Sequence, residues 1–440
     1  MVLLVLASIV GVIASVAAWA FLELIYYAQV WVFTDIPNDL GYDSAPIWWS
    51  LPILAIAGAV TALAIDRLPG QGGHEPSEGL VAGTIPPVEL PGVLLAAVAS
   101  IGLGIVLGPE APLMALGGGI GFLTIRALRK DSPPAVGQLL ASAGMFAGLS
   151  FLFGSPIIAA VILIEAAGLS RQNMPLVVIP GLLAAGIGSL VSIGMADWTG
   201  LDSSNISLGT LPLPEFGRPD LVDFLWTIPL AAAVALGTVL IFVLARRVRR
   251  IAEPHRMLVL PLAGLVIGGL AVGFSELTDK GFEEVLFSGQ DAVGGLVADS
   301  DSWSLSALAL LIAFKGLAFA VSLGGFRGGP VFPALFLGTA AGLMAGQLPG
   351  FEMSAAVAVC VGAAVVAVLR LPVAATILAA ILAMKAGSGA MPLVIVGIAA
   401  AYLTTLYMDG VSWVGSSRDD AAEQPPATPA GATAAPDSEP

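Results

Sequence analysis

The chain has 440 residues, of which 57% are hydrophobic and only 11% are charged, and its formal net charge is −14. Soluble domains average about 25% charged residues, so this composition excludes an ordinary soluble protein and indicates a membrane protein. The single cysteine, Cys360, excludes a disulfide within one chain and a cysteine-based metal site. Nucleic-acid binding is also excluded, because the sequence has no basic face to neutralise phosphates.

The chain begins with an apolar run over residues 1–27 that carries no basic residue ahead of it. This run is too long for the apolar core of a signal peptide, so we expect it to be retained as a membrane helix. About a dozen runs of roughly 20 apolar residues recur along the sequence, each long enough to span a bilayer. Together they predict an all-α, multi-pass protein of the cell membrane.

Polar segments between these runs predict loops and their sides of the membrane. Residues 34–44 and 197–220 are acidic or neutral, whereas residues 126–130 and 246–256 are basic. The positive-inside bias places the basic pair in the cytoplasm and the other pair outside. Residues 416–440 are polar, aperiodic and rich in proline and alanine, so we expect a disordered tail.

Two short segments of the sequence share one pattern of glycine, proline and leucine. GPEAPLMALG at residues 108–117 returns as GPVFPALFLG at residues 329–338, an offset of 221 residues (329 − 108). The shared positions are Gly108, Pro109, Pro112, Leu116 and Gly117, which match Gly329, Pro330, Pro333, Leu337 and Gly338. One interpretation is chance recurrence in a chain rich in both glycine and proline.

A second match in the same order favours duplication over chance. SPIIAA around Pro156 matches LPVAAT around Pro372, an offset of 216 residues (372 − 156). Paired interrupted apolar segments are typical of an inverted-repeat transporter, whose site lies between the halves at mid-membrane. We therefore predict a first repeat over residues 1–215, a second over residues 216–415, and the tail over residues 416–440.

The repeated pattern predicts helices that begin inside the membrane. Proline is tolerated in the first helical turn, where its missing N–H would have no partner anyway. A helix start leaves free N–H groups and a positive dipole end. Two such ends that converge from opposite halves form an anion site without a buried lysine or arginine.

Several segments in this order resemble the CLC family of chloride channels and chloride/proton exchangers. GPEAP is similar to the family's G-[KR]-E-G-P segment, GGPVFPALFLG to its G-x-F-x-P segment, and GQGGHEPSEGL at residues 70–80 to its G-S-G-x-P segment. The resemblance covers residues 1–413. It implies a homodimer with one pore in each subunit, a bundle of tilted and partly spanning helices, transport of chloride or a similar small anion, and no cofactor.

By position, Glu110 matches the gating glutamate of the family. The resemblance implies that its carboxylate fills the outer anion site when ionised and swings away on protonation; the alternative is a simple helix cap. The other positions implied to meet the anion include Gln71 in place of a serine, and backbone amides around Pro330, which has no N–H to donate. The implied set is Gln71, Gly72, Gly108, Ala111, Gly329, Val331, Phe332 and Trp413.

Two family residues have no direct match in this sequence. Trp413 is nearest to the expected pore tyrosine and could donate its indole N–H or serve as an interfacial anchor. The inner proton glutamate aligns with Ala166, and Glu165 precedes it, rotated by about 100° around a helix. Proton coupling by Glu110 and Glu165 and passive channel conduction therefore both stay open.

Other interpretations are weaker. Lys315 could raise the potential of the pore or be a snorkelling or paired lysine. An unrelated inverted-repeat transporter for another solute is the alternative function, but a cation carrier would present carboxylates or helix C-termini at the breaks. An intramembrane enzyme would need a nucleophile–base, paired-aspartate or HExxH arrangement, which the apolar segments lack, and His74 has no second histidine at metal-ligand spacing.

Overall fold

A computed structural model of the whole chain describes residues 1–80, 83–128, 133–167, 174–199 and 208–411. This described part is almost entirely helical and contains sixteen α-helices without a β-strand, apart from one isolated bridge. The predicted all-α fold is confirmed. The predicted tail over residues 416–440 lies outside the described residues.

The helices alternate between long spans and short pieces. In chain order they are α1 Val2–Val30, α2 Ile36–Asp39, α3 Ser50–Arg67, α4 Leu90–Ile101, α5 Glu110–Leu128, α6 Pro134–Phe153, α7 Pro156–Ala167, α8 Met174–Thr199, α9 Leu221–Ala252, α10 Arg256–Leu277, α11 Ala292–Ala298, α12 Leu305–Leu323, α13 Val331–Ala345, α14 Met353–Leu369, α15 Pro372–Leu382 and α16 Met391–Asp409. Eight spans in the described part are long and apolar enough to cross a membrane, and five shorter apolar helices are not.

Two predicted loops are largely helical. The chain stays helical through Asp39 in the segment 34–44, and α9 and α10 cover most of the basic segment 246–256. Arginine is a good helix former, and its long side chain reaches water from a helix end, so a basic run does not have to interrupt a helix. A polar or basic composition there therefore does not mark the end of a helix.

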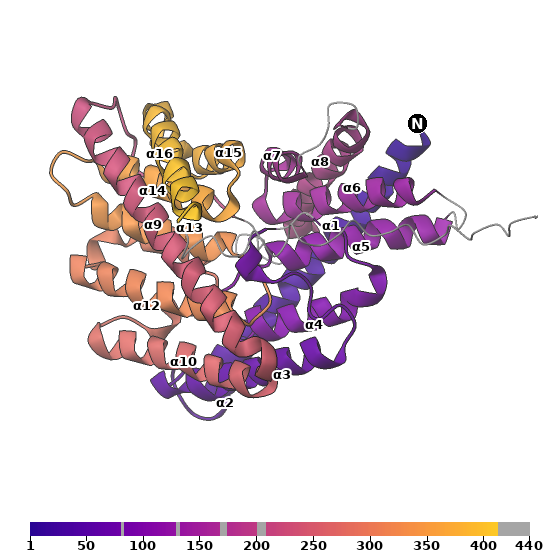
Figure 1. Cartoon of the computed structure of the whole chain (residues 1–440), viewed down its shortest axis with the longest axis horizontal. Helices are drawn as coiled ribbons and strands as arrows, with labels where there is room; N and C mark the ends of the chain where they lie inside the picture. The colour runs from indigo at the N-terminus through magenta and orange to yellow at the C-terminus, as the bar shows by residue number, and fades with distance from the viewer. Residues whose placement is uncertain (81–82, 129–132, 168–173, 200–207, 412–440) are drawn as a thin grey trace, which may run out of the picture.

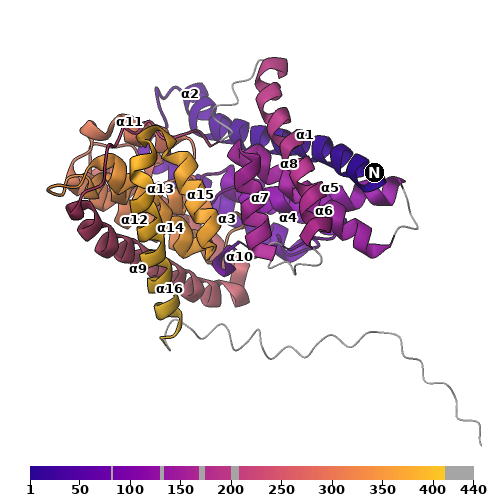
Figure 2. The same cartoon turned by 90° about the horizontal axis from the view of Figure 1, so that it is seen from above.

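Helices from the two ends of the chain lie on opposite sides of the molecule. Figure 1 shows α5 to α8 in purple and magenta on one side and α12 to α16 in orange and yellow on the other. Both views show α7 beside α15 where the sides meet (Figures 1 and 2), and these two helices are in contact. A second contact joins α3 to α10.

The second matched pair of sequence segments has the same local structure in both places. Gly154, which directly follows α6, is left-handed with φ +60°, and α7 begins at Pro156. Arg370, which directly follows α14, is left-handed with φ +59°, and α15 begins at Pro372. A left-handed residue ends a helix and a proline favours a new start, so each pair makes a sharp break between two helices.

Glycines of the repeated pattern allow the interrupted helices to pack closely. A Cβ added to Gly117 would collide with the backbone of Gly144 on α6. A Cβ added to Gly338 would lie 2.8 Å from the carbonyl oxygen of Cys360 on α14. Both contacts are closer than real Cβ atoms approach, so glycine is needed where α5 crosses α6 and where α13 crosses α14. This packing fixes the positions of the two helix starts.

Candidate functional site: two helix starts around Glu110

The two segments of the repeated pattern meet each other directly. The N–H of Gly108 donates to the carbonyl oxygen of Gly329 over 2.7 Å, and the N–H of Gly329 donates back to Gly108 over 2.5 Å. α5 begins two residues after Gly108, and α13 begins two residues after Gly329. The predicted helix starts are therefore confirmed, and they converge at one point inside the protein.

Glu110 is the first residue of α5 and lies at this point. Its side chain is fully buried, and its Oε1 accepts a hydrogen bond of 2.8 Å from the backbone N–H of Phe332 in the first turn of α13. The carboxylate of one helix start is thus bound by a free amide of the other. A hydrogen bond to a charged group is worth about 1.5–3 kcal/mol, and the helix dipole adds to it.

The space around the carboxylate is closed by glycine backbone. A Cβ on Gly108 or on Gly329 would collide with Oε2 of Glu110. Only hydrogen can occupy those two positions while the carboxylate stays where it is. The pair therefore lets the backbone approach the anionic group as closely as an anion site requires.

Phe332 also contributes an aromatic wall. Its ring stacks on that of Phe153, the last residue of α6, with centroids 5.7 Å apart and planes 15° apart. Val331 and Phe332 are both buried. Of the predicted set, the structure brings together Gly108, Glu110, Gly329 and Phe332, with Val331 next to them in the chain.

A cavity opens on one side of this point. The space between atoms at this cavity amounts to about 460 Å³, and part of it is open solvent. Its walls include Ala111 and Pro112, which directly follow Glu110, together with Gly72, Glu75 and Arg327. The loop of residues 70–80 and the first turn of α5 therefore line one cavity, and its walls include Gly72 and Ala111 of the predicted set.

Gln71 is placed differently from Gly72. Its side chain is exposed, while its carbonyl oxygen accepts two hydrogen bonds from Arg327, from Nε at 3.3 Å and from Nη2 at 3.2 Å. Gly72 has φ +76°, and a Cβ there would lie 3.0 Å from the Arg327 side chain, so this position requires glycine. That the Gln71 amide meets an anion stays a prediction.

Glu165 on α7 contacts the other matched segment of the repeat. Its Oε1 accepts from the N–H of Val373 over 3.1 Å, and its Oε2 accepts from the N–H of Ala374 over 2.7 Å. These are free amides of the first turn of α15, so Glu165 caps that helix from a neighbouring one. Its role in proton transfer stays a prediction. Trp413 lies outside the described residues.

Lys315 on α12 is buried, and its ammonium group is bound. Nζ donates to the carbonyl oxygens of Glu284 and Leu286 at 2.8 Å each and lies 4.3 Å from the ring centroid of Phe336. The two hydrogen bonds attach the segment 282–287 to α12, and the contact with the Phe336 ring joins Lys315 to α13. The interpretation as a paired lysine fits this arrangement, because the group has neutral carbonyl and aromatic partners.

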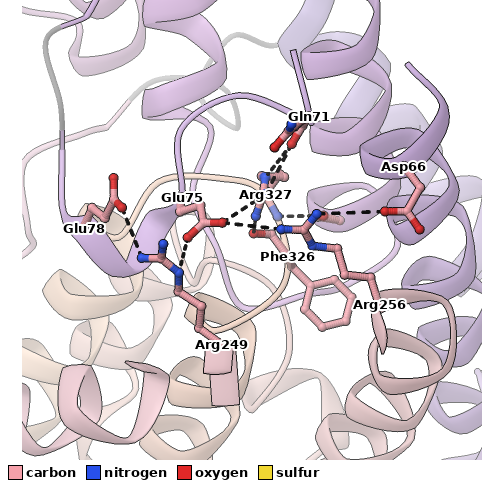
Figure 3. Close-up of polar contacts among 9 residues, drawn as sticks. Asp66, Gln71, Glu75, Glu78, Arg249, Arg256, Phe326 and Arg327 are labelled. Atoms are coloured by element: carbon pink, nitrogen blue, oxygen red, sulfur yellow. Dashed lines mark hydrogen bonds and ion pairs between the residues drawn. The ribbon is translucent and has the colours of Figure 1, made fainter. Parts of the chain in front are cut away.

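Sequence reasoning missed Arg327, which is 5% exposed and lies in the loop between α12 and α13. Figure 3 shows its guanidinium between Gln71 and Glu75, with the arginines of the α9–α10 region nearby. Nη2 lies 3.7 Å from Oε1 of Glu75, and the backbone N–H donates to Oγ of Ser100 over 3.1 Å. The available signal was an arginine only two residues before the repeated GPVFP segment, in an otherwise apolar run.

Known proteins resemble this chain in sequence and in fold. Residues 74–406 match the family described as voltage gated chloride channel. Two solved structures share the fold: a slow cyanobacterial Cl⁻/H⁺ antiporter, with a TM-score of 0.74, 20% identity and coverage of 96% of this chain and 98% of that chain, and a CLC-type fluoride/proton antiporter, with a TM-score of 0.67, 17% identity and coverage of 92% and 96%.

Sequence relatives agree with the family match. A protein named for ion transport, YfeO of Escherichia fergusonii, is 30% identical over 350 residues, which cover 77% of each chain. YfeO of Escherichia coli strain SMS-3-5 has the same identity and coverage. With eight candidate spans in its described part, the chain is a multi-pass protein of the cell membrane and belongs to the voltage-gated chloride channel family.

Proposed function

We propose that this protein moves chloride or a similar small inorganic anion across the cell membrane along a path that passes Glu110. One observation carries the proposal: the Glu110 carboxylate is hydrogen-bonded to the Phe332 amide where two helix starts converge. A carboxylate bound by a helix N-terminus occupies a site that suits an anion. The unrelated transporter considered from sequence is not favoured, because the chain belongs to a family of anion channels and transporters.

In this mechanism Glu110 acts as a gate by competition. While ionised, the carboxylate holds the Phe332 amide. An arriving anion or a proton weakens that bond: the anion replaces the carboxylate, and the proton removes its charge. The side chain then leaves, and the anion takes the free amides of the first turns of α5 and α13. Pro330 cannot donate, so the amides of Val331 and Phe332 serve α13.

Two modes of transport fit this gate. Both solved structures named above are described as proton antiporters, and in an exchanging mode Glu110 and Glu165 are the carboxylates proposed to carry the proton. In a passive mode the anion alone moves.

We also propose a homodimer and two repeats, over residues 1–215 and 216–415. The matched breaks at Gly154 and Arg370 support the two repeats.

The test is anion efflux from proteoliposomes with simultaneous pH recording, for the wild type and Glu110→Ala. Chloride efflux that drives uphill proton movement in the wild type, with proton movement lost in the variant, supports an exchanger. Efflux without proton movement in the wild type supports a channel. If no halide and no nitrate leaves the vesicles, the anion pathway is wrong.

Light scattering during gel filtration gives the mass of the assembly and tests the dimer.

A further inference from the structure

A second carboxylate lies at the cavity that opens beside Glu110. Glu75 lines this cavity, as do Ala111 and Pro112. Its side chain is 20% exposed, so the group can be reached from water, whereas Glu110 is fully buried. The cavity therefore lies between the Glu75 side chain and the residues that directly follow Glu110 in α5.

Three guanidinium groups, which we name the arginine cluster, surround the Glu75 carboxylate: Arg249 at the end of α9, Arg256 at the start of α10, and Arg327. Arg249 Nε contacts Oε2. Arg256 Nη2 and Arg327 Nη2 lie 3.9 Å and 3.7 Å from Oε1. Figure 3 shows the carboxylate at the centre of these three side chains. Arginine keeps its charge in a protein, so the cluster is permanently cationic.

The contacts to Oε1 are too long for hydrogen bonds, so charge rather than directed bonding holds that oxygen. The other carboxylates of the group are further out: Glu78 contacts Arg249 at 3.1 Å, and Asp66 contacts Arg256 at 3.9 Å. Three carboxylates thus face three guanidinium groups. If Glu75 turns away, two carboxylates remain, and the arginine cluster carries one uncompensated positive charge.

We propose that Glu75 is a second, inner gate: a tethered anion in the arginine cluster that the transported anion must displace to cross the cavity mouth. Glu110 has the same relation to the helix starts, so the path would hold two carboxylates in series. The loop that carries Glu75 belongs to the first part of the chain, and the cluster belongs to the later part. This inference rests on the anion transport proposed above.

The arrangement predicts a change in the concentration dependence of transport. If Glu75 fills the site about nine-tenths of the time, its neutralisation lowers the half-saturating chloride concentration about tenfold. Glu75→Gln keeps the shape of the side chain and removes its charge. Glu352→Gln is the control, because Glu352 is an exposed glutamate just before α14 that makes no capping bond and does not line the cavity. Arg327→Gln should raise the half-saturating concentration.

The measurement is tracer chloride exchange in proteoliposomes over a range of chloride concentrations. A decrease for Glu75→Gln, with Glu352→Gln unchanged, supports the gate. An unchanged value for Glu75→Gln while the wild type transports chloride overturns this inference and leaves the proposed function intact. A wild type without exchange overturns the proposed function itself.

A second measurement covers the case in which Glu75→Gln does not give folded protein. Wild-type crystals grown in bromide should show anomalous scattering beside the Arg327 guanidinium, with the Glu75 side chain turned toward the mouth. Bromide beside Arg327 with Glu75 still between the three arginines would contradict displacement. Bromide only at the helix starts of α5 and α13 would also overturn the inner gate.

Discussion

The carboxylate of Glu110 and the backbone amide of Phe332, 222 residues apart in sequence, form a hydrogen bond of 2.8 Å in the interior of the protein. Neither residue makes an anion site alone. Glu110 is the first residue of α5, and Phe332 lies in the first turn of α13. The bond therefore shows that the positive ends of these two helices meet at the Glu110 carboxylate.

Removing the charge of Glu110 should free this amide for an anion. We expect Glu110→Gln to bind chloride at least about tenfold more tightly, which corresponds to about 1.4 kcal/mol. Isothermal titration calorimetry of the purified protein measures the affinity. The control is Glu352→Gln, an exposed glutamate just before α14 whose side chain makes no capping bond. Equal affinities for the wild type and Glu110→Gln would mean that the carboxylate does not compete with the anion.

A side chain at Gly329 should displace the gate. A Cβ at this position collides with the Glu110 carboxylate, so Gly329→Ala must move that side chain or break the backbone bridge to Gly108. Overpacking of this kind costs about 1–3 kcal/mol. The melting temperature should fall, and anion efflux should change with it. Gly237→Ala on α9 is the control, because an added Cβ there meets nothing within 4 Å. A wild-type melting temperature for Gly329→Ala would contradict the close packing.

Neutralising Glu165 distinguishes its contact with the start of α15 from its proposed role in proton transfer. Glutamine has one acceptor oxygen, so Glu165→Gln loses one of the two bonds to the start of α15, at a cost of about 1 kcal/mol. If the wild type exchanges protons, we expect the variant to keep anion efflux and lose proton movement, because an amide cannot carry the proton. Thermal melting and paired anion and pH recordings measure both effects. Coupling that survives the change would restrict Glu165 to the helix cap.

Lys315 should matter for stability through its two carbonyl partners. In Lys315→Met the carbonyl groups of Glu284 and Leu286 lose their donor, which should destabilise the protein by about 2 kcal/mol or more. Lys385→Met, at an exposed lysine, should leave the melting temperature unchanged. A change in anion selectivity without a loss of stability would instead favour a role of Lys315 in the potential of the pore.

Much of the site follows from local rules of the sequence. Proline is tolerated in the first turn of a helix, so the segment GPEAP predicts a helix start, which the structure places at Glu110. The segment GPVFP predicts a second start for the same reason, and α13 begins at Val331. Membrane composition, repeated segments and broken helices indicate a transporter, since non-helical backbone inside a membrane needs protein or water around it.

Local rules failed where long side chains decide the outcome. Basic segments counted as loops are mostly helix, because arginine supports a helix and reaches water from its end. Arg327 received no role from sequence, since its importance depends on Gln71 and Glu75, which lie some 250 positions away and meet it only in the fold. The same holds for Glu165, whose carboxylate caps the start of α15. This contact depends on α7 and α15 being neighbours in the fold.

The sequence by itself determined the membrane environment, the helix starts and the duplicated pattern, because these depend on composition and on residues next to each other in the chain. Only the tertiary structure decided which groups share one place: Gly108 with Gly329, Glu110 with Phe332, and Glu75 with the arginine cluster. The physical reason is that charge and hydrogen bonding act over a few ångströms in space, whereas their partners are separated by hundreds of residues.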